Sequence, residues 1–187
     1  CRDVTDLDER TRQLHVLDNI LNAKPDILKI EGRMRSPEYV KTVTRAYKEA
    51  IQAWQEGALT EHLKQRLTEK MREVYNKGFS TGFYNGQPLH EWAGVYGSKA
   101  TKKKTYAGRI TNYYEQPGVA EAKLESTSIQ EGQAYLIIGP TTGVQEGTLP
   151  ELRVDGKTTT KTEKGATATF KTKKVRTNDK LYLVEDT

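Results

Sequence analysis

The sequence predicts an α+β protein in which the end of an α/β barrel, with its helices, is followed by a small all-β domain. A short apolar stretch at residues 27–30 is bounded on both sides by amphipathic patterns of helical period. Such alternation of strand and helix builds α/β barrels. From residue 106 onward, six short runs rich in β-branched and aromatic residues alternate with glycine-containing turns, which favours a small, closed or nearly closed six-stranded barrel.

The first predicted elements are a helix and a short strand. Leucines recur at helical spacing over residues 8–23, and Pro25 ends the pattern. Residues 27–30 then form an apolar run of the kind found in buried parallel strands, here covered by helices on one side. Because the chain opens so close to this strand, without Met, we expect it to be the C-terminal part of a longer protein.

Two longer helices should follow the strand. Ser36-Pro37-Glu38 is a strong helix start, because serine caps, proline suits the first turn and glutamate complements the dipole. An apolar face that includes Val40 runs on to Gly57, which ends the helix. Thr60 caps the next helix. Its stripe consists of Leu63, Leu67, Met71 and Val74.

The composition shift after residue 98 defines the predicted domains. Residues 1–98 form the end of the barrel with a helical extension, residues 99–105 a linker and residues 106–187 the β domain. Within residues 1–98, the glycine–aromatic stretch 78–86 either packs one domain against the next or lines a pocket that stacks bases. The six expected strands are 106–113, 119–124, 134–138, 147–154, 167–171 and 180–184.

Charged residues gather where the strand at 27–30 gives way to the next helix. The C-terminal ends of barrel strands carry the catalytic groups of α/β barrels, which makes Glu31 and Arg33 the catalytic candidates. A carboxylate and a guanidinium there could grip an anionic or peptide-like substrate. The alternative is an ion pair or cap that stabilises the last turn of the barrel. Lys29, which strand alternation turns to the barrel interior or to an outer face, and Arg35 are candidates for substrate binding.

The basic excess lies in the second half of the chain. The formal net charge is +5, and residues 99–187 hold 15 basic and 11 acidic side chains, against 15 and 14 in residues 1–98. This permits contact with nucleic acid without requiring it. The candidate RNA-binding residues stand beside tyrosines in sequence, and the alternative is an ordinary solvated surface. They are Lys102, Lys103, Lys104, Lys173, Lys174 and Arg176.

No metal site or nucleophile is recognisable within the chain. His15, His62 and His90 stand on separate segments without metal-ligand spacing, and no Ser–His–Asp or Cys–His arrangement is present. Cys1 is the one cysteine, so it is a metal-ligand candidate only if its partners lie upstream. The sequence also lacks a signal-peptide pattern and any apolar run of about 18 residues, so we expect a cytoplasmic protein that does not enter the membrane.

Three motifs in order resemble the C-terminal portion of peptidase family U32, the collagenase-like proteases. They are Leu28-Lys29-Ile30-Glu31-Gly32-Arg33-Met34-Arg35-Ser36 followed by Tyr39-Val40, then Asn76-Lys77-Gly78-Phe79-Ser80-Thr81-Gly82-Phe83, and Ile137-Ile138-Gly139-Pro140-Thr141-Thr142-Gly143. The resemblance implies an α/β barrel followed by a β-barrel that looks like domain 2 of elongation factor Tu. It also implies that the family's cysteine signature lies upstream, so a metal or iron–sulfur centre would belong to the full-length parent and not to this chain alone.

The resemblance implies two alternative functions. The first is a fragment of a U32 peptidase, inactive by itself, whose β-barrel is an accessory domain that binds a peptide or protein substrate or a partner. The alternative follows from family members similar to proteins of prephenate-dependent tRNA wobble-uridine hydroxylation, and makes the chain the RNA-binding part of such a protein, with tRNA as partner. The sequence leaves the oligomeric state open.

Overall fold

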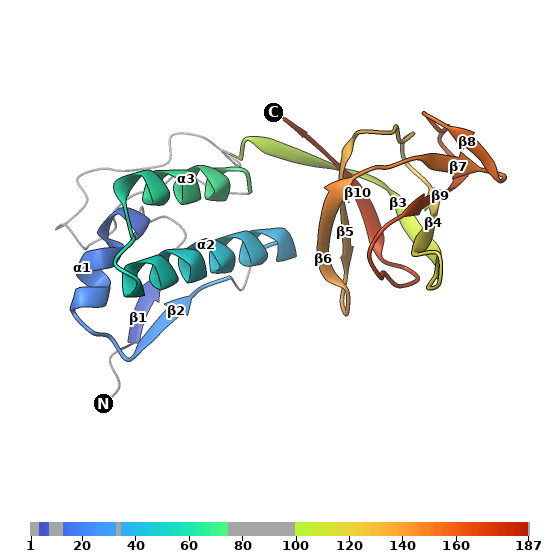
Figure 1. Cartoon of the computed structure of the whole chain (residues 1–187). Helices are drawn as coiled ribbons and strands as arrows, with labels where there is room; N and C mark the ends of the chain where they lie inside the picture. Colours follow the sequence, from blue (N-terminus) through green and yellow to red (C-terminus); the bar gives the residue numbers. More distant parts are fainter. Residues whose placement is uncertain (1–3, 8–12, 33–34, 75–99, 187) are drawn as a thin grey trace. The chain divides into compact units, whose positions relative to one another are not determined.

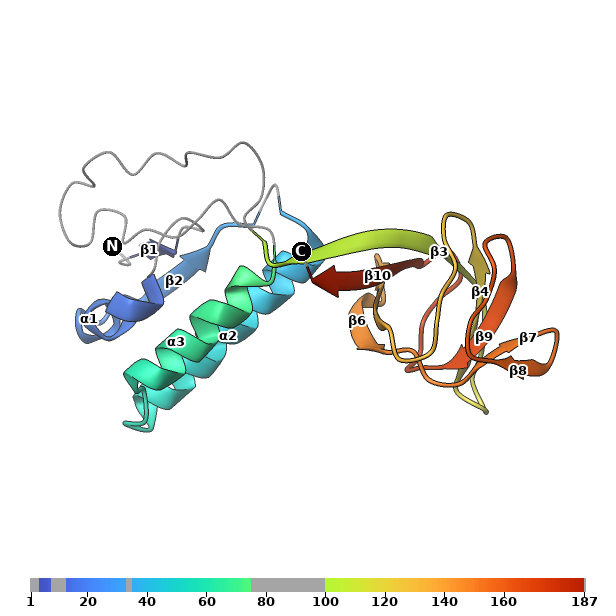
Figure 2. The ribbon, with the colours of Figure 1, turned by 90° about the horizontal axis from the view of Figure 1, so that it is seen from above.

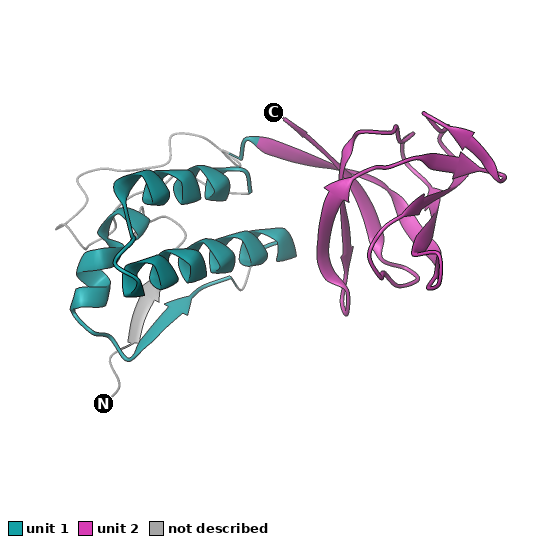
Figure 3. Cartoon of the chain, viewed as in Figure 1, with its two compact units in different colours: residues 1–101 teal, residues 102–187 magenta. Residues whose placement is uncertain are grey.

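The computed structural model describes residues 4–7, 13–32, 35–74 and 100–186. The chain divides into two compact units, residues 1–101 and residues 102–187, coloured separately in Figure 3. No helix within the described ranges is long and apolar enough to cross a membrane.

A strand–helix–strand unit opens the first unit. Strands β1 (Val4–Leu7) and β2 (Ile27–Ile30) pair in parallel. The connection between them includes a 3₁₀ turn, η1 (Gln13–Val16), which continues into α1 (Leu17–Asn22) (Figure 1). The helix expected over residues 8–23 is therefore described only from Gln13 onward, and its first described turn is 3₁₀.

Two longer helices complete the first unit. Helix α2 (Pro37–Gln55) and helix α3 (Glu61–Arg72) pack side by side in both views (Figures 1 and 2). The Thr60 hydroxyl accepts a hydrogen bond from the Leu63 amide at 3.2 Å, as the capping pattern predicts. Ser36 occupies the corresponding position before α2, but its side chain makes no capping hydrogen bond.

The helices bury one face of β2 and leave the other exposed. Leu28 and Ile30 pack against the helical core, whereas Ile27 is 40% exposed and Lys29 is exposed. Among the described residues, the helices therefore cover one side of the strand, which is the arrangement expected for this apolar run. The core is made by Leu14, Val16, Leu17, Ile20, Leu21, Tyr39, Val43, Ala46, Tyr47, Ala50, Leu67 and Met71.

The buried face of α2 differs from the expected one at its first turn. Tyr39 and Ala46 are buried together with Val43 and Tyr47, at spacings of three, four and seven residues. Val40 is 38% exposed instead. Its side chain packs on the preceding loop, where a Cβ placed on Gly32 would meet the Val40 Cγ2 atom at 2.8 Å.

The second unit is one antiparallel sheet of eight strands. Its order is β6-β5-β10-β3-β4-β9-β7-β8, with β6 and β8 at the two ends. The strands are β3 (Lys102–Tyr114), β4 (Val119–Leu124), β5 (Ala134–Gly139), β6 (Gly143–Thr148), β7 (Leu152–Val154), β8 (Lys157–Thr159), β9 (Thr167–Lys171) and β10 (Lys180–Asp186).

Two expectations for the second unit are wrong. The sheet has eight strands where six were expected, and its order does not close into a barrel. The run expected at 147–154 is interrupted at Pro150, which has no amide hydrogen to donate, so that β6 and β7 are separate strands. The threonine-rich β8 follows the Asp155-Gly156 turn, where both residues have positive φ, as a tight hairpin requires. The likeness to domain 2 of elongation factor Tu stays a prediction.

The expected linker at residues 99–105 also needs correction. Lys102 to Thr105 belong to β3, and the lysines at 102 and 103 lie opposite Asp186 and Glu185 of β10. Opposite charges directly across an antiparallel pair favour pairing. A lysine-rich run that looks like linker in isolation is therefore half of a charge-matched strand pair.

A buried carboxylate ties the β5–β6 hairpin to the start of β10. Asp179 is 2% exposed, and its Oδ2 atom accepts hydrogen bonds from the Thr142 hydroxyl at 2.5 Å and the Arg176 amide at 2.8 Å. A Cβ on Gly139 would stand 1.7 Å from Asp179 Oδ1, so glycine leaves room for this carboxylate. The Gly-Pro-Thr-Thr-Gly motif is thus the turn of a structural hairpin between β5 and β6.

Candidate functional site

Four residues were predicted to take part in catalysis or substrate binding, and three of them are described: Lys29, Glu31 and Arg35. They lie at the end of β2 and in the connection to α2. Lys29 and Glu31 are exposed, and Lys29 lies on the face of β2 turned away from the helices. Arg35 is half-buried, with its guanidinium carbon 5.8 Å from the centroid of the Tyr39 ring. Its backbone amide donates to the Gly32 carbonyl at 3.0 Å, which closes a turn before the helix. A carboxylate and two cations therefore lie on β2 and on the short connection that follows it.

Some predicted features lie outside the described residues. Arg33, Cys1 and the glycine–aromatic stretch 78–86 all fall there. Among the described residues, no three His, Cys, Asp or Glu side chains are grouped to hold a metal ion. The ligand set of a metal or iron–sulfur centre is therefore not found in the described part of this chain.

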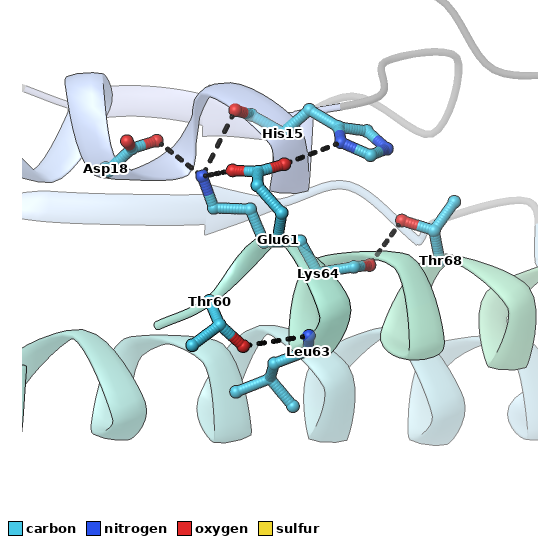
Figure 4. A network of polar contacts seen from close by, with 7 residues as sticks. All are labelled: His15, Asp18, Thr60, Glu61, Leu63, Lys64 and Thr68. Carbon is cyan, nitrogen blue, oxygen red and sulfur yellow. Dashed lines mark hydrogen bonds and ion pairs between the residues drawn. The ribbon is translucent and has the colours of Figure 1, made fainter. Parts of the chain in front are cut away.

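A polar network among the described residues of the first unit joins α3 to the segment η1–α1 (Figure 4). The Lys64 side chain is 3% exposed, and its Nζ atom lies 2.8 Å from Glu61 Oε1 and 3.0 Å from Asp18 Oδ1. Nζ also donates to the His15 carbonyl at 3.4 Å. Sequence reasoning missed this network, because a single lysine beside the apolar stripe of a helix is normally exposed at the surface, and the sequence does not show that Lys64 is buried.

The charges in this network support one another. For Lys64, burial acts to lower the pKa, but hydrogen bonds to Glu61 and Asp18 outweigh it and the pKa is raised. Hydrogen bonding to Lys64 lowers the pKa of Glu61. At Asp18, burial acts to raise the pKa, and the hydrogen bond and charge of Lys64 reverse this, so that the pKa is lowered. The network therefore consists of one cation and two anions, and it links α3 to the segment η1–α1.

The two predicted basic clusters do not come together. The lysines at 102, 103 and 104 open β3, while Lys173, Lys174 and Arg176 lie in the exposed loop between β9 and β10. That loop is fixed beside the far end of β3, because Thr177 Oγ1 donates to the Thr111 carbonyl at 3.3 Å and the Tyr113 hydroxyl donates to the Thr172 carbonyl at 3.3 Å. The clusters are thus separated by about 30 Å of strand.

Sequence reasoning missed a set of side chains on the outward face between these clusters. In β10, Lys180 and Tyr182 alternate with the buried Leu181 and Leu183. Their register partners on β3 are Arg109 and Tyr106, and Arg109 is in turn opposite Lys123 of β4. Strand alternation was the available signal, but pairing between strands distant in sequence was needed to join them.

The two tyrosines of this face are in contact. The rings of Tyr106 and Tyr182 meet edge to face with centroids 5.6 Å apart, and Lys104 Nζ lies 5.0 Å from the Tyr182 centroid. The Tyr106 hydroxyl donates to Glu125 at 2.6 Å, which raises the pKa of Tyr106. Glu125 also pairs with Arg109 at 2.9 Å.

Comparison with known proteins gives a family match and several relatives. Residues 8–94 match the model of peptidase family U32. A collagenase of Porphyromonas gingivalis is 42% identical over 172 residues, which is 91% of this chain and 48% of that protein. A tRNA hydroxylation protein of Bacillus subtilis is 36% identical over 117 residues, which is 62% of this chain and 27% of that protein.

The chain spans about half the length of the collagenases that it matches, at 48% and 42%. Among solved structures, the C-terminal domain of a Geobacillus thermoleovorans protein described as a U32 peptidase aligns with a TM-score of 0.40 and 15% identity. That alignment covers 42% of this chain and 90% of that domain.

Proposed function

The chain belongs to peptidase family U32, and from this premise we propose that it forms one edge of the substrate site of a collagenase-like peptidase. Residues 102–187 would be an accessory domain that binds substrate or a partner. Since the chain spans about half of the collagenases that it matches, the remaining edges of the site would come from the rest of the parent protein.

One observation carries this proposal. Within the described part of the chain, the helices cover one face of β2, and Ile27 and Lys29 stand exposed on the other. In an α/β barrel, the face turned away from the helices is the barrel interior, and the C-terminal ends of the strands surround the active site. Glu31 directly follows that end of β2 and is exposed, which suits a residue that meets substrate.

The chemistry of the connection fits a peptide substrate. A carboxylate such as Glu31 can accept hydrogen bonds from peptide amides, and the cations of Lys29 and Arg35 can donate to peptide carbonyls or to a terminal carboxylate. Arg33, the second catalytic candidate, would add a guanidinium to the same connection. We assign these residues to substrate binding and polarisation, with the chain inactive by itself.

In the full-length parent, we expect Glu31→Gln to lower kcat/KM on a gelatin-derived peptide by about tenfold or more, because a charge-assisted hydrogen bond is lost. Arg33→Ala should act in the same direction. The measurement is peptide turnover with unfolding curves as a check on the fold, and Glu69→Gln, an exposed glutamate of α3, is the matched control. Unchanged turnover in a folded Glu31→Gln protein would rule out this site assignment.

A second candidate function is the RNA-binding part of a tRNA-modifying protein. The relative named for tRNA hydroxylation favours it, as does the exposed basic loop that holds Lys173, Lys174 and Arg176. Lys174 forms an ion pair with Glu115, but both side chains stay more than 60% exposed. Exposed cations of this kind attract phosphates in a salt-dependent way.

For this second candidate, we expect the chain to bind tRNA with an affinity that falls as salt rises. Lys173→Glu with Lys174→Glu should weaken binding about tenfold, since two attractive charges become repulsive. Filter binding at two salt concentrations is the measurement. Lys157→Glu with Lys164→Glu is the charge-matched control on exposed positions elsewhere in the second unit. A tRNA affinity that changes neither with the salt concentration nor in the Lys173→Glu, Lys174→Glu variant would contradict this function.

A further inference from the structure

We propose that the outward face of strands β10, β3 and β4 is a binding platform for single-stranded RNA, on which Tyr106 and Tyr182 stack bases. We call this surface the tyrosine platform; it consists of Lys104, Tyr106, Arg109, Lys123, Lys180 and Tyr182. The inference goes beyond the peptidase proposal and deepens the second candidate function, on which it rests for the choice of RNA.

The geometry of the sheet gathers the platform from three strands. Lys180 is the register partner of Arg109, and Arg109 is the register partner of Lys123, so three cations form one row across adjacent strands. Like charges directly opposite one another destabilise a sheet. Within the protein, Glu125 pairs with Arg109 and Lys123 Nζ donates to the Gly165 carbonyl at 2.6 Å, which offsets part of this repulsion. The exposed row of cations still suits an anionic partner.

The tyrosines form a second row beside the cations. A β-bulge in β3 brings Tyr106 opposite Tyr182, and both rings are half-buried. Aromatic side chains on a sheet surface are the usual platform for unpaired bases, because every base offers a π-face. The Tyr106 hydroxyl is tied to Glu125, which fixes the orientation of the ring.

The charges around the tyrosines suit a phosphate backbone. Lys104 lies over the Tyr182 ring, and such a cation–π contact at an exposed position is weak enough for a base to replace it. Lys104, Arg109, Lys123 and Lys180 are all exposed, while Glu125 pairs with Arg109. Cations in a row at the spacing of neighbouring strands can contact successive phosphates of one extended strand.

A duplex would not use this surface in the same way. Stacking needs bases that are unpaired, and in double-stranded RNA the base faces are already covered by their neighbours. The platform therefore predicts a preference for single strands, whereas a surface that works by charge alone would accept a duplex equally well.

The test is fluorescence anisotropy of the 187-residue chain with a labelled single-stranded oligoribonucleotide and with the same strand in a duplex. We expect tighter binding of the single strand. Tyr106→Ile with Tyr182→Ile, which keeps β-forming apolar residues in the strands, should weaken binding about tenfold or more and leave the salt slope unchanged. Arg109→Gln with Lys180→Gln should reduce the slope by about 1.4.

Two variants keep this result interpretable. Tyr182→Phe preserves the ring and should bind as the parent chain does, which separates stacking from loss of the fold. Tyr114→Ile removes a tyrosine that is 43% exposed farther along β3 and should also bind normally. Circular dichroism checks that each variant keeps its sheet.

Three outcomes would overturn the tyrosine platform: no binding of the single strand, equal binding of strand and duplex, or unchanged binding by the double tyrosine variant. Displacement by polyglutamate as effective as by RNA would assign the face to acidic proteins instead. If the tyrosine platform is overturned, the proposed peptidase function and the proposed tRNA-binding function both remain possible. Peptide turnover by the parent is a separate measurement, and tRNA binding through the loop at residues 173–176 would persist in the tyrosine variants.

Discussion

Replacing both Asp18 and Glu61 by alanine is expected to lower the free energy of unfolding of the first unit by about 3 kcal/mol. The reason is the buried ammonium of Lys64, which would keep only the His15 carbonyl at 3.4 Å as a partner among the contacts of the network. Trp54 and Trp92 both lie in residues 1–101, so tryptophan fluorescence during urea unfolding reports on this unit.

Lys64→Met provides the matched control for that loss. It removes the cation and leaves Asp18 and Glu61 with side chains that are 44% and 75% exposed, so that water can solvate both carboxylates. We therefore expect a cost within about 1 kcal/mol. If Lys64→Met proves as destabilising as the double variant, the Lys64 side chain stabilises the first unit through its packing and not through its charge.

The same network should make stability depend on acid pH. The pKa values of Asp18 and Glu61 are lowered in the folded chain, so their contribution is complete above the ordinary carboxyl value of about 4. It is lost as the pH falls through the lowered folded values. Unfolding curves of the parent chain should therefore shift more between neutral and acid pH than those of the double alanine variant.

Gly108→Ala is expected to destabilise the second unit by about 3 kcal/mol, at the upper end of overpacking effects. An added Cβ would stand 1.9 Å from the backbone carbonyl oxygen of Lys123 on the neighbouring strand. A side chain could rotate away from such a clash, but a carbonyl in a strand cannot move without parting β3 from β4. Far-ultraviolet circular dichroism during urea unfolding measures the loss of this sheet.

Gly132→Ala separates this clash from the general cost of replacing glycine. Gly132 has a φ of +85° and nothing within 4 Å of an added Cβ, so only the left-handed backbone opposes alanine. That conformation costs about 1 kcal/mol. Equal losses in the two variants would show that the close approach at Gly108 is not what limits the sheet.

Much of the fold was predictable because it depends on local patterns. The strand at 27–30, the Thr60 cap and the strands Val119–Leu124 and Thr167–Lys171 agree with the expectations at both ends. The predictions were wrong where the same local pattern is compatible with two different structures. Lysines at 102–104 resemble a linker until Asp186 and Glu185 are known to lie opposite, and β8 is too short for its threonines to be distinguished from a turn.

The candidate site was predictable only in part. Lys29 lies in β2 and Glu31 directly after it, where the sequence pattern placed them, and Arg33 lies outside the described residues; their roles stay predictions. The tyrosine platform and the Lys64 network join residues that are 46 or more positions apart, such as Asp18 with Lys64 and Tyr106 with Tyr182. Periodicity reports which face of an element is apolar, but it does not say which elements share that face.

The pairing of β3 with β10 has a consequence for how the second unit folds. Lys102 and Asp186 are register partners, so the strand pair brings together positions from the two ends of residues 102–187. Such non-local pairing makes chain closure a slow step. It also makes residues 102–187 suitable for circular permutation, because a short peptide could join the paired ends while new termini open at an exposed turn such as Asp155-Gly156.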